Sequence, residues 1–437
     1  MRPTSPFANA DLTDRILTSL PDFKTLQSTI LTSKSIYSVF RNRPHSIVRA
    51  VAYNQIGPAL PQAVRLVRCG HAKLWLKPVD ELLGEDELVK HSILTNEEVR
   101  MLVDKAKVVE GLEDIFSWRE KDRNFTTSQL SAAESARFHR AMYRIWLFAT
   151  IYGHTACVHR DDIEFDEHET RQHEKKFLAS FVTPELREIE RLATFMCQIA
   201  TWAENAGYTE HEYFGDSFSD FALFHGPHAV LAAYSDDMGW VEPFDDDDFL
   251  LERYDGFLFS AVSRVLEERK QSHMTDEQAK KIVLDNIIGG EDKCERCQSD
   301  SVKGTSLWGP NNWSFLPGFV RLYDWKDKLK GRLGFNIAET VGFNQACSAT
   351  PWPILIGEVF DQKTEAYDLW NKDDWICRDC LEIFLKNHLH LWYLEKKRET
   401  GVIPENCWYG YNCRTQMHNM DHARKLNHWC EPTKGDP

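Results

Sequence analysis

Helical periodicity begins in the N-terminal segment Leu12-Thr-Asp-Arg-Ile16-Leu17-Thr-Ser-Leu20-Pro21-Asp22. Its four apolar residues are spaced by four, one and three positions, which places them on one face of a helix. Pro21 ends that helix, because proline inside a helix removes a hydrogen bond and clashes with the preceding turn. Asp22 is placed to cap the N-terminus of the next helix. The segment therefore predicts two short helices in succession.

Two further apolar stripes follow at the same spacing. The first predicts a helix that carries Leu26, Ile30 and Leu31. The second predicts a helix capped by Thr32 or Ser33. Residues 8–69 are therefore expected to form a domain with three short helices at its start. On periodicity alone, this domain has no defined role.

These N-terminal positions resemble an F-box. The resemblance covers about 40 residues and is carried by the quoted segment, by Leu26, by Leu31-Thr-Ser33-Lys34 and by Tyr37. Residues 46–68 resemble the sequence that follows the F-box in many fungal F-box-like proteins.

The resemblance implies the substrate-recognition subunit of an SCF-type (cullin-RING) ubiquitin ligase. Such a subunit has no catalytic activity of its own. Its N-terminal helices bind a Skp-type adaptor, which connects it to a cullin, and the rest of the chain binds a protein substrate that the sequence does not name. Core and adaptor-facing residues are then expected among seven side chains, which are Leu12, Ile16, Leu17, Leu20, Leu26, Ile30 and Leu31.

The middle of the chain predicts further helices, so the expected fold class is mainly α. The clearest one covers residues 130–152, with Ser131 or Ser135 near its start and Gly153 just past its end. Others are expected over residues 183–203, 257–270 and 275–288, whereas residues 207–255 are expected to be irregular. The expected domains are an F-box-like domain (8–69), a helical body (70–290) and a Cys/His- and Trp-rich zinc-binding region (291–437).

Composition and charge exclude several classes of protein. The 437 residues are 42% hydrophobic, which is enough for a core, and their formal net charge is −15. Residues 1–69 hold nine Lys or Arg against three acids, so the remainder of the chain is strongly acidic. Binding of nucleic acid through the whole surface is therefore not expected. The sequence shows no apolar run of about 18 residues and no apolar signal core. We therefore expect no membrane contact and a location in the cytoplasm or nucleus.

Two Cys-x-x-Cys pairs lie in the C-terminal third, Cys294-Glu-Arg-Cys297 and Cys377-Arg-Asp-Cys380. Such a pair can direct two thiolates to one tetrahedral ion. The second pair opens a predicted helix, whose dipole favours thiolate over thiol, and so resembles a treble-clef arrangement. A structural zinc bound by these cysteines is the prediction. Reduced cysteines without metal and a redox role are the alternatives.

A denser cluster follows near the C-terminus. It has six potential ligands within 24 residues, which are Cys407, Cys413, His418, His422, His428 and Cys430. Thiolate and imidazole are the ligands of structural zinc, so a second zinc is predicted here. Two other arrangements stay open. The second Cys-x-x-Cys pair can join Cys407 and Cys413 instead, and His388 or His390 can contribute.

The C-terminal cluster also resembles the poly(ADP-ribose)-binding zinc finger. The resemblance rests on Cys-x5-Cys with Tyr-Gly inside, followed by His-x5-His. It implies that Cys407, Cys413, His422 and His428 bind the zinc.

No sequence feature indicates an enzyme. Phosphate loops, dinucleotide-binding loops and nucleophile elbows do not occur. A catalytic zinc needs an open coordination position, whereas these cysteine-rich sites are expected to be closed. The alternatives to the ubiquitin-ligase subunit are a zinc-finger module that binds poly(ADP-ribose) or nucleic acid, and a zinc-stabilised scaffold with a vestigial F-box. Nucleic acid is the less expected ligand because of the charge.

Overall fold

The computed structural model describes residues 9–71, 84–85, 93–153, 167–205, 218–235, 256–313, 326 and 328–435. Within these residues the regular structure is helical, and β pairing is limited to isolated bridges. The prediction of a mainly α fold is confirmed.

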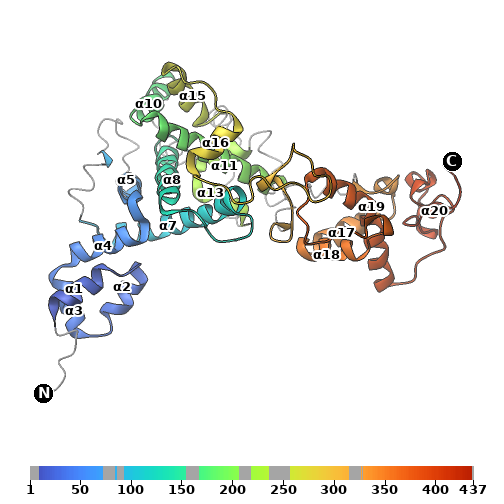
Figure 1. Cartoon of the computed structure of the whole chain (residues 1–437), viewed down its shortest axis with the longest axis horizontal. Helices are drawn as coiled ribbons and strands as arrows, with labels where there is room; N and C mark the ends of the chain where they lie inside the picture. Colours follow the sequence, from blue (N-terminus) through green and yellow to red (C-terminus); the bar gives the residue numbers. More distant parts are fainter. Residues whose placement is uncertain are drawn as a thin grey trace. The chain divides into compact units, whose positions relative to one another are not determined.

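The chain divides into two compact units (Figure 1). Unit 1 comprises Met1–Ser117, Thr127–Ala200 and Glu212–Asn286, and unit 2 comprises Trp118–Thr126, Thr201–His211 and Ile287–Pro437. The three expected domains, with boundaries at 69/70 and 290/291, stay a prediction.

Residues 9–56, here called the head, begin unit 1. They form four helices, which are α1 (Ala10–Thr18), α2 (Phe23–Ile30), α3 (Lys34–Asn42) and α4 (Pro44–Ile56). Asp22 caps α2 as predicted, since its carboxylate accepts the N–H of Thr25 at 2.6 Å. Ser33 caps α3. The helix α1 starts ahead of the first predicted apolar residue because the side chain of Asn9 caps it.

The head has a hydrophobic core of its own. Leu17 of α1, Leu26 of α2 and Ile36 of α3 meet Ile47 and Val51 of α4 there. Full burial of such a side chain contributes roughly 1.5–3 kcal/mol. The core of the head therefore comes from local segments of the chain.

The rest of unit 1 is a helical body. Its helices are α5 (Leu60–His71), α7 (Asn96–Phe116), α8 (Ala132–Tyr152), α10 (Glu167–Ala179), α11 (Thr183–Asn205), α12 (Phe218–His225), α13 (Pro227–Tyr234), α15 (Phe259–Glu268) and α16 (Asp276–Val283). The long helix α8 contacts α5, α7, α12 and α13. Ser131 caps it in a capping box with Glu134, and it ends at Tyr152 with Gly153 just past its end, as predicted.

The prediction of irregular structure over residues 207–255 is wrong where α12 and α13 lie. Both helices are short and apolar on most sides, so they lack the amphipathic period that marks a surface helix. Gly226 separates them with a φ of +101°, and a Cβ there would lie 3.2 Å from the ring of Trp146. Residues 207–217 and 236–255 of this range lie outside the described residues.

The helix α16 ends five residues before the predicted limit of 288. Thr275 caps its start in a capping box with Gln278. At its end, the guanidinium of Arg137 donates to the carbonyl of Val283 at 2.8 Å. The N–H of Asp285 donates to Glu134 at 2.7 Å instead of continuing the helix. Contacts from α8 therefore take over the backbone groups that the helix would have used.

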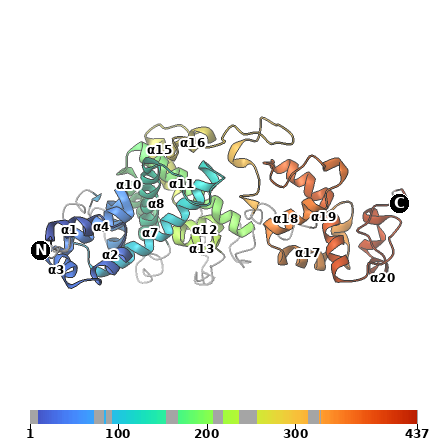
Figure 2. The ribbon, with the colours of Figure 1, turned by 60° about the horizontal axis from the view of Figure 1, so that its bottom comes forward.

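Unit 2 is built on the helices α17 (Thr340–Ala349), α18 (Trp352–Asp361), α19 (Arg378–Thr400) and α20 (Met420–Lys425). Figure 2 shows α18 alongside α19, and the two helices contact each other. The core of unit 2 includes Phe343, Phe384, Trp392 and Trp429. Among the described residues, no helix has the length and hydropathy that a membrane span requires.

Candidate metal centres

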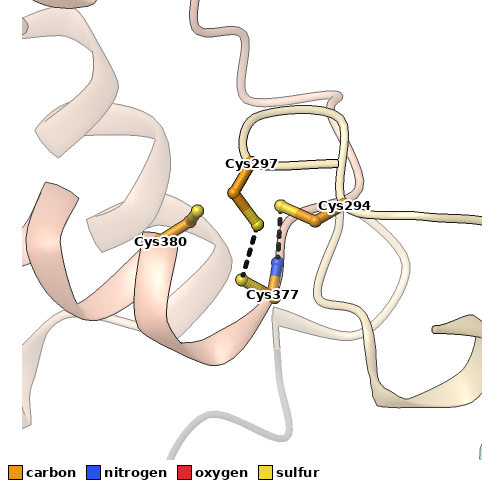
Figure 3. A group of neighbouring side chains, drawn as sticks. All are labelled: Cys294, Cys297, Cys377 and Cys380. Carbon is orange, nitrogen blue, oxygen red and sulfur yellow. Dashed lines mark hydrogen bonds between the residues drawn. The ribbon is translucent and has the colours of Figure 1, made fainter. Parts of the chain in front are cut away.

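The two Cys-x-x-Cys pairs meet at one point in unit 2 (Figure 3). Cys294 and Cys297 lie in the loop after α16, where the N–H of Gln298 closes a turn on the carbonyl of Cys294 at 2.9 Å. Cys377 is the N-cap residue of α19, and Cys380 lies in its first turn. Residues three apart on a helix are neighbours on its surface. A loop and a helix start therefore each present two sulfur atoms, and we call this group the four-cysteine site.

The sulfur atoms are spaced as ligands of one ion. All four lie within 4.8 Å of one another, and those of Cys297 and Cys377 are 3.7 Å apart. A tetrahedral zinc with Zn–S bonds of about 2.3 Å places two sulfurs roughly 3.8 Å apart. The residues present therefore fit a tetrahedral ion with four sulfur ligands.

Backbone groups favour a thiolate at Cys294. Burial raises the pKa of this thiol, but the N–H groups of Cys297, Cys377 and Arg296 outweigh it and lower the pKa to about 7. The N–H of Cys377 lies 3.2 Å from the sulfur. In contrast, burial and the neighbouring thiols raise the pKa of Cys380. Adjacent thiolates repel one another, and a divalent cation offsets that repulsion by binding them directly.

Backbone hydrogen bonds join the two segments that carry the cysteine pairs. We call the segment with Cys294 and Cys297 the first arm and the segment with Cys377 and Cys380 the second arm. Trp308 and Ile376 exchange two hydrogen bonds of 2.8 Å. Glu295, inside the first pair, donates its N–H to the carbonyl of Trp375 at 2.9 Å, and its carboxylate accepts the N–H of Trp375 at 3.1 Å. At Gly309 a Cβ would come within 2.5 Å of the Trp375 ring, so only glycine fits there.

A second ligand group forms near the C-terminus, from Cys407, Cys413, His422 and His428, and we call it the Cys/His site. His422 lies on α20 and Cys413 directly follows the short helix η11 (Gly410–Asn412). A parallel bridge between Asn406 and Asn427 brings the two ends of this segment together. Cys407 and His428, one residue beyond each bridge partner, thereby come to the same centre.

The geometry and the protonation state of the Cys/His site fit a metal ion. The Nε2 atom of His422 lies 3.8 Å from the sulfur of Cys407 and 3.4 Å from that of Cys413. Tetrahedral zinc places such atoms roughly 3.6 Å apart. His428 is fully buried, and its ring nitrogens have no hydrogen-bond partner within the described residues. Burial, followed by the charge of His422, lowers the pKa of His428 to about 4. A buried neutral imidazole with no partner is a ready metal ligand.

The other candidate ligands lie outside both groups. The thiol of Cys430 instead donates to the carbonyl of Asn427 at 3.4 Å, and His418 is exposed. His388 and His390 lie on α19 and belong to neither group. The second Cys-x-x-Cys pair groups with the first pair and not with the Cys/His site.

Two residues that support the Cys/His site carry no sequence signal. Glu339 accepts hydrogen bonds from the indole of Trp429 and, at 2.6 Å, from the ammonium of Lys397. Asn336 donates to buried Gln416 at 3.0 Å, and Gln416 in turn donates to the carbonyl of the ligand Cys413 at 2.9 Å. These partners of Glu339 and Asn336 lie 58 to 90 residues away along the chain. Periodicity and motif spacing therefore do not reveal either residue.

The seven head residues named from the F-box resemblance divide by burial. Leu12 and Leu31 are exposed, and Ile16 is half-buried. Leu17 and Leu26 belong to the core of the head, and Leu20 and Ile30 pack against it. Leu31 is 75% exposed and Leu12 is 43% exposed. Tyr37 of α3 is exposed as well. The structure thus separates core residues from outward-facing ones, which periodicity does not do.

Comparison with known proteins yields no match. No protein-family model, no curated protein and no solved structure matches this chain.

Proposed function

We propose that this chain is a non-catalytic substrate receptor of an SCF-type ubiquitin ligase, in the cytoplasm or nucleus. Its head would bind a Skp-type adaptor and through it a cullin, and the rest of the chain would hold an unknown protein substrate. One observation carries the proposal. A small set of capped helices with its own hydrophobic core and F-box-like spacing leaves apolar Leu12 and Leu31 exposed. Leu12 and Leu31 are the positions at which an adaptor would make apolar contacts with this head.

We further propose that both ligand groups bind structural zinc. The ligand sets are thiolate and imidazole, which suit zinc, and each offers four protein ligands. Four protein ligands leave no open position for a substrate or a reactive water. Zinc in these sites would therefore stabilise unit 2 and supply no catalysis, in line with a receptor that acts by holding its substrate.

The test is capture of a purified recombinant Skp-type adaptor by the tagged full chain. We expect near-equal amounts of the two proteins. The double variant Leu12→Glu/Leu31→Glu should weaken capture at least about tenfold, because it brings charges into an apolar contact. Both positions are exposed, so the head should stay folded. Leu17 is unsuitable for this test because it is fully buried.

A matched control uses the same change at another exposed apolar residue. Val402 of unit 2 is 98% exposed, and Val402→Glu should leave adaptor capture unchanged. Absence of capture by the unaltered chain would refute the receptor proposal. Equal capture by the head variant would refute the assignment of Leu12 and Leu31.

A second candidate function is binding of a polyanion by the Cys/His segment. Trp408, next to a ligand cysteine, is 63% exposed, and the ammonium of Lys434 lies 3.5 Å from its ring centre. Arg414, Arg424 and Lys425 are exposed and form no ion pair within the described residues. Salt-sensitive binding of poly(ADP-ribose) that Trp408→Ala abolishes would support this candidate, and binding insensitive to both would exclude it.

A further inference from the structure

A buried arginine from a distant part of the sequence contacts residues that flank the four-cysteine site. Arg123 belongs to the segment Trp118–Thr126 of unit 2 and is 4% exposed. The indole N–H of Trp118 donates to the backbone carbonyl of Arg123 at 3.2 Å and so fixes the backbone of Arg123. The segment is also tied to the chain before the first cysteine pair, because the N–H of Ile288 donates to the carbonyl of Lys121 at 2.8 Å.

The guanidinium of Arg123 closes the loop that carries the first cysteine pair. It donates to the carbonyl of Gly304 at 2.6 Å, to that of Gly289 at 3.4 Å and to the carboxylate of Asp292 at 2.6 Å. Gly289 and Gly304 flank the pair on its two sides, and both have positive φ. A Cβ at Gly304 would lie 2.7 Å from the carbonyl oxygen of Gly290. One side chain therefore holds both ends of a tightly packed loop.

The same guanidinium also contacts the second arm. It lies over the ring of Trp375, 4.2 Å from the ring centre. Trp375 stands two residues before Cys377 and is paired through its backbone with Glu295 of the first arm. Arg123 thus contacts residues that hold each cysteine pair in place, without being a metal ligand itself. It makes none of these contacts with the Cys/His site.

We propose that Arg123 is a positioning residue for metal binding at the four-cysteine site, an inference that rests on the proposed structural metal. Arginine suits the task because its planar guanidinium donates several hydrogen bonds in fixed directions and stacks on an aromatic ring. Lysine keeps the charge but has neither the fork nor the flat face. Loss of a residue that supports metal ligands typically weakens metal binding about 10- to 100-fold.

The test compares cobalt(II) binding by the full chain and by Arg123→Lys, with a chromogenic chelator as competitor. Sulfur-to-cobalt absorption is stronger with four thiolates than with two, so the two sites titrate with different spectra. We expect Arg123→Lys to bind cobalt about 10- to 100-fold more weakly at the four-cysteine site, with the Cys/His site unchanged. This selectivity is a readout that general destabilisation of unit 2 would not produce.

The matched control is Arg378→Lys. Arg378 is next to the ligand Cys377 in sequence, but its side chain is 60% exposed and pairs with Glu382. The same substitution there should change cobalt affinity at neither site. If Arg123→Lys does not fold, Asp292→Asn removes the negative charge that pairs with the guanidinium, at a position that is 57% exposed. It should weaken the four-cysteine site in the same direction by a smaller factor.

The outcomes separate this inference from the proposal on which it rests. Two cobalt ions in the unaltered chain and equal affinities in Arg123→Lys would overturn the role of Arg123 alone. Equal weakening at both sites would also overturn it, because it would show a general structural effect. An unaltered chain that binds no metal would overturn the structural metal sites and this inference together.

Discussion

The head and unit 2 differ in how far apart in sequence their contacting residues lie. The core of the head joins residues from Leu17 to Val51, all supplied by neighbouring helices. The four-cysteine site instead joins side chains 80 residues apart in sequence. Closing such a long loop costs conformational entropy that a bound ion can offset. We therefore expect the head to fold without metal, whereas unit 2 should depend on it.

The largest expected effect is that of metal removal. Structural zinc contributes about 10–16 kcal/mol to the folding of small zinc-finger peptides. A strong chelator should therefore abolish hydrogen-exchange protection in α19 and α20 of unit 2 and leave protection in α1 to α4 of the head unchanged. Hydrogen exchange read by mass spectrometry gives both results in one experiment. Equal loss of protection in the two regions would contradict the comparison.

Single cysteine changes should have the next largest effect. Cys294→Ser removes a ligand of the four-cysteine site, so the count of bound zinc should fall from two ions to one and unit 2 should lose stability. Cys430→Ser alters a buried cysteine that belongs to neither ligand group. It should keep two zinc ions, as measured by elemental analysis of the purified chain. Loss of zinc in both variants to the same extent would show that the ligand assignment is wrong.

A core change in the head should cost less. Leu17→Ala should lower the free energy of unfolding of the head by about 2–5 kcal/mol, since the side chain is fully buried. Leu31→Ala is the control and should change it by no more than about 0.5 kcal/mol. Thermal or denaturant unfolding measures both values. Metal removal should not alter the difference between the two variants, and a metal-dependent difference would count against a head that folds without metal.

The smallest expected effect is a pH dependence at His390. Burial, followed by the charge of Lys330, lowers the pKa of this histidine to about 4. In the unfolded chain it takes up a proton near pH 6.5. The unfolded state is therefore favoured as the pH falls from about 6.5 towards 4, and above 6.5 this penalty is absent. His390→Leu should make unit 2 less acid-sensitive by about 1–3 kcal/mol.

The measurement is the free energy of unfolding of the unaltered chain and of His390→Leu, each at pH 7 and at pH 5. The difference between the two chains should change with pH. Protonation of metal ligands affects both chains alike and cancels in that difference. A difference that does not change with pH would exclude His390 as a source of acid sensitivity.

Local features of the structure are well predicted from the sequence. Asp22 and Ser131 cap helices where the sequence places a cap, because a cap depends on three or four consecutive residues. The helix expected from residue 275 begins directly after its cap at Thr275. The apolar helices α12 and α13 escape prediction because burial on most sides removes the period.

The candidate sites show the same limit. The eight candidate ligands are identified from residue type and spacing, and the structure brings them together in two groups of four. Which pairs share a centre stays open in the sequence, because the two Cys-x-x-Cys pairs are far apart along the chain. Arg123 and Glu339 cannot be found from sequence patterns, since their partners lie up to 181 and 90 residues away. Only the packed chain reveals such contacts.

We propose that the head binds an adaptor without metal, while metal stabilises unit 2. The most direct measurement is adaptor capture by the full chain before and after zinc is removed with a chelator, with bound zinc counted in both samples. We predict near-equal amounts of a recombinant Skp-type adaptor in both samples, with two zinc ions per chain before treatment and none after it. Adaptor capture that is absent from the start, or that disappears with the zinc, would contradict this proposal.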